Sequence, residues 1–305
     1  MQWELLTSKE IEDMAKKEKI CLIPIGILER HGDHGPLGTD VLAAHKIAVE
    51  AAKLEPCVVF PGYWFGQGHE ATHSPGAIVF DSDLTITILR NLCDEIGRNG
   101  FTKIMFVNGH GGNMPMLNYF LFSNMDRDVP YTLYAVSFDV GLSSSELDEI
   151  YKYVIPDGGH ADAWETSLAM SAAPGSVKLE NCKAPEPIEA LKRVKHLGRV
   201  KTPFSWYASY PEHVTGSPSK ATKEAGDKLV EMVIGKNVYK LLNLDMIESV
   251  NSAMEPAPEN QEGPRENQLC AFVAVDKNMN VTYSHYARTM TDFPDVKDII
   301  KEMLK

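Results

Sequence analysis

The segment ICLIPIGILERHGDHGPLGTD, residues 20–40, joins an apolar run directly to a polar loop. The run from Ile20 to Ile27 predicts a buried β-strand. Glycine and proline exclude a helix in the loop that follows it. Within twelve residues this loop gathers side chains that bind metals or carry protons, namely Glu29, His31, Asp33, His34 and Asp40.

The spacing of these side chains allows several of them to face one point. Glu29 and His31 are two residues apart, and in extended backbone such residues face the same side. Asp40 can return to that point if the Gly-Pro-Leu-Gly segment before it folds back, and its composition suits a turn. We interpret the segment as a metal or catalytic loop at a strand end, in preference to a polar surface loop with chance histidines.

Composition narrows the class of protein. The chain has 305 residues, of which 44% are apolar, and a net charge of −12. This charge argues against binding to nucleic acid or to an anionic membrane surface, and simple solubility explains it. Five scattered cysteines without a C-x-x-C pair suit a reducing compartment. With no signal peptide and no apolar run of membrane-spanning length, we expect a soluble cytoplasmic protein.

Strand and helix patterns alternate along the first half of the chain. Apolar runs predict strands at 21–26, 57–60, 103–107 and 131–137. Helical periodicity predicts helices at about 8–18, 41–54, 83–98 and 114–124, the first opened by a capping box at Thr7–Glu10. This order predicts an α/β fold with a mostly parallel sheet covered on both faces. Ligands bind at the carboxyl ends of such strands, so the loops 29–40 and 108–113 should share one site.

The second loop, Asn108-Gly109-His110-Gly111-Gly112-Asn113, contributes His110 as a candidate ligand. A single histidine in a glycine-rich turn is more often a turn residue, but its place at the same sheet edge favours a ligand. Asn108 and Asn113 could fix the turn by side-chain hydrogen bonds. A phosphate cradle is the rival interpretation, and it lacks the Lys-Ser/Thr that such a loop requires.

A third cluster, residues 157–167, holds His160 and Glu165 near a predicted helix that runs to about Ala173. Five residues apart, the two side chains would lie about 140° apart on a regular helix, so they converge only if His160 lies in the preceding loop. Glu165 could instead be a first-turn carboxylate that complements the helix dipole. A fourth segment, Gly68–Ala77, carries His69 and His73 in a loop that we expect near the site without direct ligation.

These motifs resemble the creatininase (creatinine amidohydrolase) family over roughly residues 1 to 245. The resemblance rests on Pro24-x-Gly26-x-x-Glu29-x-His31-Gly32-x-His34-x-Pro36-x-x-Thr39-Asp40, then His73-x-Pro75-Gly76, Asn108-Gly109-His110-x-x-Asn113 and His160-Ala161-x-x-x-Glu165-Thr166-Ser167. It implies a three-layer α/β/α domain, two adjacent divalent metals and a homo-oligomer, commonly a hexamer. By resemblance Asp40 bridges both metals, Glu29 and His110 hold one, and His31 holds the other.

Imidazole and carboxylate ligands without thiolates suit zinc, manganese or iron(II). The sequence also departs from the family pattern. Gly112 stands where creatininase has a glutamate ligand, so we expect Glu165 to replace it, and His160 to transfer a proton or stabilise an oxyanion. Asp139 and Pro156 stand where creatininase has aromatic residues. We assign substrate binding to His34, His73, Gly76, Asn108 and Asp139.

The predicted function is hydrolysis of a small polar metabolite, at a cyclic amide or formamide C–N bond, through a metal-activated water. The departures argue against creatinine itself, and the family also includes formamide-cleaving enzymes, a small-peptide hydrolase and a hydrolase of a cyclic keto-inositol. Opening of a cyclic ketone ring is therefore one alternative. A catalytically weak protein that binds a metal or a metabolite on the same scaffold is another.

The C-terminal part departs from the common family pattern. We predict a metallohydrolase domain over 1–250, a polar, proline-rich linker over 251–267 and an appendage over 268–305. The appendage should hold strands at 269–275 and 280–285 around a Lys277-Asn278 turn, and a helix at 292–304. It could cover the site of a neighbouring subunit or extend the oligomer, or it could be a packed cap without a functional role.

Overall fold

A computed structural model describes residues 1–137, 144–154, 158–182, 187–198, 200, 202–233, 271–275 and 281–286. Contacts divide the chain into two compact units, Met1–Met246 and Ile247–Lys305, which are described separately. The predicted boundaries at 250 and 267 stay predictions.

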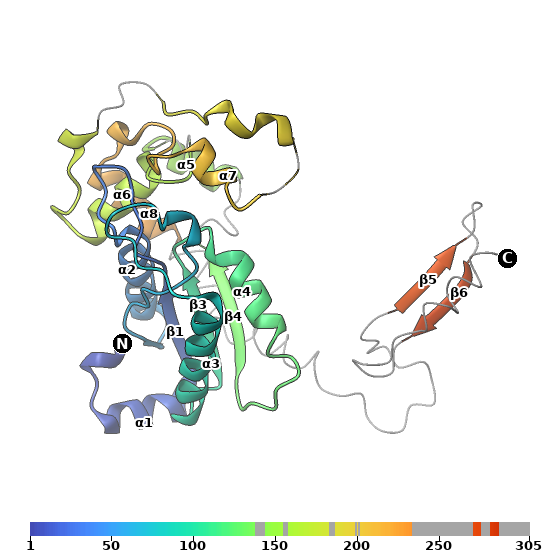
Figure 1. Ribbon diagram of the computed structural model, residues 1–305. Helices are drawn as coiled ribbons and strands as arrows, with labels where there is room; N and C mark the ends of the chain where they lie inside the picture. The colour runs from blue at the N-terminus through green and yellow to red at the C-terminus, as the bar shows by residue number, and fades with distance from the viewer. Residues whose placement is uncertain are drawn as a thin grey trace. The chain divides into compact units, whose positions relative to one another are not determined.

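A parallel sheet forms the centre of the first unit (Figure 1). Its strands are β1 (Ile20–Ile25), β2 (Val58–Val59), β3 (Lys103–Asn108) and β4 (Thr132–Ser137), in the order β2-β1-β3-β4. The register pairs Ile25 with Asn108 and Asn108 with Ser137. The chain therefore leaves β1, β3 and β4 at one edge, as the predicted parallel sheet requires.

The helices of the first unit precede, connect or follow these strands along the chain. They are α1 (Ser8–Lys17), α2 (Thr39–Leu54), α3 (Ser82–Arg98), α4 (Asn113–Phe122), α5 (Ser144–Tyr151), α6 (Ala163–Ala172), α7 (Ser205–Ser209) and α8 (Lys223–Val233). Short 3-10 turns are η1 (Trp3–Leu5), η2 (His69–Ala71), η3 (Leu179–Asn181), η4 (Lys192–Leu197) and η5 (Pro218–Lys220). The capping box predicted at Thr7 and Glu10 is confirmed.

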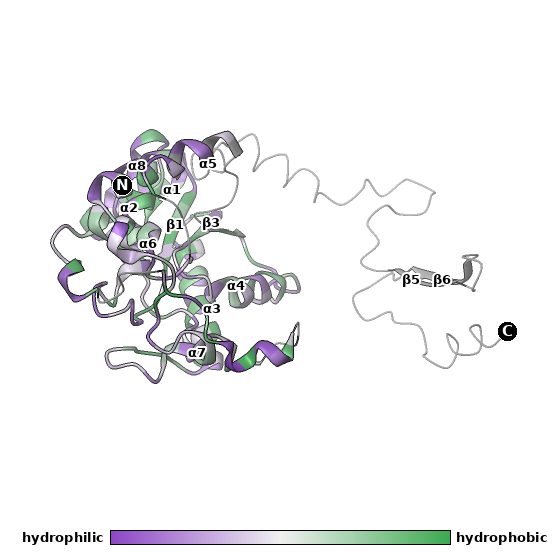
Figure 2. Ribbon diagram, turned by 90° about the horizontal axis from the view of Figure 1, so that it is seen from above, coloured by the Kyte–Doolittle hydropathy of each residue, from purple (hydrophilic) through white to green (hydrophobic). Residues whose placement is uncertain are grey.

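Two hydrophobic cores lie on opposite faces of the sheet. Successive strand residues point to opposite faces, so Leu22 joins the core formed with α2, α6 and α8, and Ile23 joins the core formed with α1, α3 and α4. Strand β1 is coloured as hydrophobic in Figure 2 and has helices on both sides. The three-layer α/β/α arrangement is thus confirmed.

Two helix starts differ from the sequence-based prediction, and both matter for the site. Helix α2 begins at Thr39, so Asp40 lies in its first turn and not in the preceding loop. Helix α6 begins at Ala163 with Asp162 as its N-cap, where the carboxylate accepts from the backbone amides of Trp164 and Glu165. His160 therefore lies before the helix, and the 140° separation of a regular helix does not apply to it.

The second unit contains an antiparallel pair, β5 (Ala271–Val275) and β6 (Val281–Tyr286), with an irregularity between Ala274 and Val275. This confirms the two predicted strands. The predicted Lys277-Asn278 turn, the linker 251–267 and the helix 292–304 lie outside the described residues. Among the described helices, none combines the length and apolar character needed to cross a membrane.

The contact between α6 and α8 leads to a prediction about stability. A Cβ on Gly226 would overlap the carbonyl oxygen of Ser167 and lie 2.6 Å from its carbonyl carbon. Both are backbone atoms, so the two helices would have to separate. We expect Gly226→Ala to cost roughly 3 kcal/mol of unfolding free energy, at the upper end of ordinary overpacking.

Denaturant unfolding followed by circular dichroism measures this loss. Gly111→Ala is the matched control, because a Cβ there meets no described atom within 4 Å. Equal stability of the two variants would contradict the close approach of α6 and α8.

Candidate metal centre

A cluster of titratable side chains lies buried at the edge of the sheet where β1 and β3 end. Glu29 and His31 come from the loop after β1, Asp40 from the first turn of α2, and His110 from the loop after β3; their exposed fractions are 1, 1, 2 and 6%. The two loops therefore share one site, as the sequence predicts. Such burial is costly unless opposite charges or a bound cation compensate it.

Asp40 lies between two imidazoles. Its Oδ1 is 3.1 Å from His31 Nε2, and its Oδ2 is 3.3 Å from His110 Nδ1. Each oxygen of this carboxylate thus faces a different histidine. This is the arrangement that a bridging carboxylate requires.

Two further carboxylates lie on either side of Asp40. Glu29 Oε1 is 2.8 Å from His110 Nδ1, and Glu165 Oε2 is 3.5 Å from His31 Nε2. The side chains therefore form two adjacent groups that share Asp40. One consists of Glu29, Asp40 and His110, and the other of His31, Asp40 and Glu165.

The outer nitrogen of each imidazole faces an oxygen that can only accept a hydrogen bond. His31 Nδ1 lies 3.2 Å from the carbonyl oxygen of Glu29, His160 Nε2 lies 3.1 Å from that of Arg30, and His110 Nε2 lies 3.3 Å from Glu70 Oε1. These acceptors place the proton of each neutral ring on its outer nitrogen. The inner nitrogens of neutral rings would then present lone pairs to carboxylate oxygens, which is stable only with a metal cation or an added proton between them.

The inner atoms fit this requirement. Among the described residues, Glu29 Oε1, His31 Nε2 and both Asp40 oxygens are buried without a hydrogen-bond partner. Three candidate metal-holding groups among the described residues have ligand atoms within 4.8 Å of one another. Glu29/His31/Asp40 combines the residues just named, and the other two, His31/His160/Glu165 and Glu29/His160/His213, both include His160. Carboxylate and imidazole without thiolate suit zinc, manganese or iron(II).

Without a metal ion, protons supply the positive charge. Burial disfavours charged His31 and His110, but the carboxylates around them outweigh it and raise the pKa of each well above its usual range. Burial likewise opposes the charged form of Glu29, yet His110 and His160 hold the pKa of that carboxyl well below its usual range. Metal binding would displace these protons, so metal affinity should fall as the pH is lowered.

Two asparagines hold His110 in its turn, as the sequence predicts. Asn108 Nδ2 donates to the carbonyl oxygen of His110 at 2.7 Å, and Asn108 Oδ1 accepts from the His110 amide at 3.2 Å. Asn113 Nδ2 donates to the same Asn108 oxygen at 3.1 Å. The backbone turn that carries His110 is therefore held by buried hydrogen bonds.

An unusual backbone conformation directs His160 and Glu165 toward the cluster. Ala161 has a left-handed φ of 51°, and its amide donates to Glu165 Oε2 at 2.7 Å. His160 Nδ1 then lies 3.7 Å from both Glu29 Oε1 and Glu165 Oε2. Such strain in a residue other than glycine often occurs at functional sites.

The residues assigned to substrate binding occupy different places. Asn108 is used in the His110 turn, and buried His34 has Nε2 3.1 Å from both the carbonyl oxygen of Ala161 and Thr166 Oγ1. Exposed His73 packs against His213, with ring centroids 4.9 Å apart. Gly76 has a φ of 85°. Asp139 and Pro156 lie outside the described residues. These substrate assignments stay predictions.

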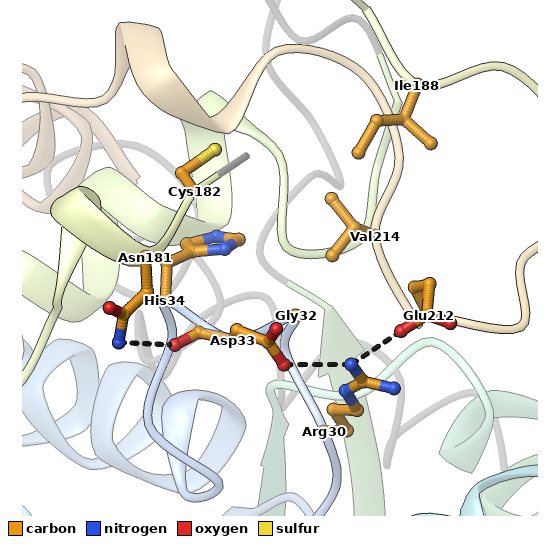
Figure 3. Close-up of a pocket in the computed structure, with 9 residues that line it drawn as sticks. All are labelled: Arg30, Gly32, Asp33, His34, Asn181, Cys182, Ile188, Glu212 and Val214. Atoms are coloured by element: carbon orange, nitrogen blue, oxygen red, sulfur yellow. Dashed lines mark hydrogen bonds and ion pairs between the residues drawn. The ribbon is translucent and has the colours of Figure 1, made fainter. Parts of the chain in front are cut away.

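A cavity of about 340 Å³ lies along the loop that carries His31 (Figure 3). Arg30 stands on its wall between Asp33 and Glu212, at 2.8 and 2.6 Å. The guanidinium is therefore held by two carboxylates. Val214 and Ile188 form an apolar wall opposite Asn181 and Cys182.

Two further residues that contact the cluster are not indicated by the sequence patterns. Glu70 contacts His110, and fully buried His213 has Nδ1 3.5 Å from Glu29 Oε2. Glu70 lies in the segment 68–77, which the sequence marks as near the site only through its histidines. His213 has a left-handed φ of 49°, which no local sequence signal indicates.

Comparison with known proteins gives the family of the chain. The sequence model of the family described as "Creatininase: Creatinine amidohydrolase" matches residues 4–241. The chain is 25% identical over 295 residues to 3-dehydro-scyllo-inosose hydrolase of Thermotoga maritima, covering 87% of each chain. It is also 25% identical over 252 residues to creatinine amidohydrolase of Pseudomonas putida, covering 75% of this chain and 91% of that one.

The fold is similar to solved creatininase structures. A creatininase variant described as Zn-Zn type superposes with a TM-score of 0.64 and 19% identity, over 84% of this chain and 98% of that one. The family match covers most of the chain and includes every residue of the buried cluster. The chain therefore belongs to the creatininase family and is a hydrolase of that family.

Proposed function

We propose that this protein is a dinuclear metallohydrolase of a small polar metabolite. Two divalent cations, zinc, manganese or iron(II), would share Asp40, with Glu29 and His110 on one side and His31 and Glu165 on the other. The observation that supports this most strongly is that both oxygens of buried Asp40 face imidazole nitrogens and have no hydrogen-bond partner among the described residues. A lone carboxylate so placed needs compensating charge on each side.

The cations, when bound, would acidify a water molecule and polarise a carbonyl group. The chain supplies the remaining functions. His160 Nδ1 lies between Glu29 and Glu165, where it can carry a proton to the leaving atom or stabilise a developing oxyanion. The Arg30 carbonyl oxygen accepts from His160 Nε2 and keeps the ring in the orientation that this role requires.

The bond that we propose is cleaved is a cyclic amide or formamide C–N bond. Opening of a cyclic ketone ring is the second candidate, and it is favoured by the similarity to the inosose hydrolase, which extends over 87% of both chains. A catalytically weak binding protein is a poorer candidate. Gly112 cannot supply the glutamate ligand of the family pattern, but Glu165 lies beside His31 and can supply a carboxylate in its place. A homo-oligomer, a hexamer by resemblance, stays a prediction.

Metal analysis tests the proposal together with a substrate screen. Protein purified without chelator and saturated with zinc or manganese should hold two equivalents per chain. It should also hydrolyse at least one compound from a panel of small cyclic amides, formamides and cyclic ketones. A reproducible single equivalent under saturating metal would exclude the dinuclear proposal.

Glu165→Gln tests the second cation position within the same experiment. The variant keeps the size of the side chain and removes its charge beside His31. Its affinity for one cation should fall by roughly a hundredfold or more. Loss of a residue that only hydrogen-bonds to a metal ligand already lowers metal affinity by about 10–100-fold. Excess metal should partly restore turnover, whereas unchanged titration curves would leave Glu165 only as a carboxylate in the first turn of α6.

A further inference from the structure

The acceptor that faces the outer nitrogen of His110 differs from those of the other two histidines. His31 and His160 each face a backbone carbonyl oxygen, but His110 Nε2 faces the carboxylate of Glu70 at 3.3 Å. Glu70 belongs to η2, a turn in a different loop. A carboxylate is a stronger acceptor than a carbonyl group, so it makes the opposite ring nitrogen a better electron donor.

The Glu70 carboxylate is itself held in place. Gln67 Nε2 donates to Glu70 Oε2 at 2.9 Å, and the backbone N–H of Gln67 donates to Asn113 Oδ1 at 2.7 Å. Asn113 in turn belongs to the asparagine pair that fixes the His110 turn. Only 19% of the Glu70 side chain is exposed. The carboxylate and the ring that it faces are thus anchored to one hydrogen-bonded group.

Gly112 leaves room for this contact. A Cβ at this position would overlap both Glu70 Oε1 and His110 Nε2, and would lie 3.0 Å from Gln67 Nε2. Any side chain at position 112 would therefore disrupt the contact between Glu70 and His110. Gly112 lacks the ligand side chain of the family pattern. A side chain at this position would break the pair formed by the Glu70 carboxylate and the His110 imidazole.

We propose that Glu70 is a positioning residue that orients His110 and strengthens it as a ligand for the cation held with Glu29 and Asp40. This inference rests on the proposed metal centre. It has a consequence for the two cation positions: the Glu29–Asp40–His110 position should be the tighter one, because His31 has only a carbonyl oxygen behind it.

Titration of the apo-protein with Co²⁺ tests this inference, since the d–d absorption reports ligand geometry independently of turnover. The wild type should bind in two steps of different affinity. Glu70→Ala should weaken the tighter step by about 10–100-fold and change its absorption band, while the weaker step stays the same. Glu70→Gln keeps an acceptor oxygen without the charge and should fall between the two.

Gly112→Ala disrupts the contact between Glu70 and His110 without changing either residue. Its titration should therefore resemble that of Glu70→Ala. Glu95→Gln is the matched control, because Glu95 is an exposed carboxylate on α3 that pairs with Arg98 on the same helix. Thermal unfolding of each apo-protein shows whether the variant is folded. If Glu70→Ala does not fold, Glu70→Gln, which preserves the side-chain volume, still tests the inference.

The outcomes separate this inference from the proposed function. A wild type that binds no Co²⁺ would overturn the metal centre itself. A wild type that binds two equivalents, with Glu70→Gln and Gly112→Ala identical to it, would overturn the role of Glu70 alone. Equal weakening of both steps with an unchanged absorption band would make Glu70 a merely structural residue and would also overturn it.

Discussion

Asp40→Ala should remove both cations and abolish most of the turnover. The substitution deletes the carboxylate whose two oxygens face His31 and His110. Metal Lewis acids contribute several kcal/mol to barrier lowering, so loss of both should slow turnover on the order of 10⁴-fold. Metal analysis after dialysis and steady-state rates on the best substrate measure the two effects.

Two controls make this experiment specific. Asp40→Asn keeps the shape and removes the charge, so it should lose metal almost as completely as the alanine variant. Asp128→Ala removes an exposed carboxylate after α4 and should keep wild-type metal content. Full metal content and full turnover in Asp40→Ala would show that the assignment of Asp40 as the shared ligand is wrong.

His160→Ala should leave both cations bound and lower turnover by a factor on the order of 10²–10⁴, the usual range for loss of an acid–base group. Its Nδ1 is 3.7 Å from two carboxylate oxygens, whereas His31 and His110 approach Asp40 to 3.1 and 3.3 Å. This longer separation is why we assign proton transfer, and not metal binding, to His160.

Metal content and rate must be measured on the same samples of this variant. Exposed His196 in η4 provides the control, and His196→Ala should match the wild type in both. If His160→Ala loses a cation while Glu165→Gln keeps both, the two roles are reversed. If neither variant changes either quantity, the segment 158–165 only starts a helix.

Sequence predicts this molecule best where local pattern and topology agree. The apolar run at 20–27 followed by a polar loop predicts both β1 and the position of Glu29 and His31. Parallel strands then bring His110 to the same edge, because the paired strands end in register. The Asn108 and Asn113 hydrogen bonds follow from the ordinary preferences of asparagine in turns.

The remainder depends on features that local patterns do not carry. Glu70 meets His110 through folding of two separate loops, and no spacing within either loop indicates this contact. His213 and Ala161 adopt left-handed backbone that residues other than glycine rarely take, so tertiary packing determines it. Similarly, the start of α2 at Thr39 places Asp40 on a helix, although glycines and a proline precede it.

The proposed ligand set would also link cation binding to the global stability of the chain. Glu29 and Glu165 are far apart in the sequence and meet only in the folded chain, so an unfolded chain presents no comparable site. Ligand binding to the native state alone stabilises it by about 2.7 kcal/mol at a concentration of 100 times Kd. Where cellular metal is scarce, the protein would therefore unfold more often, and its abundance would follow the metal supply as closely as its activity does.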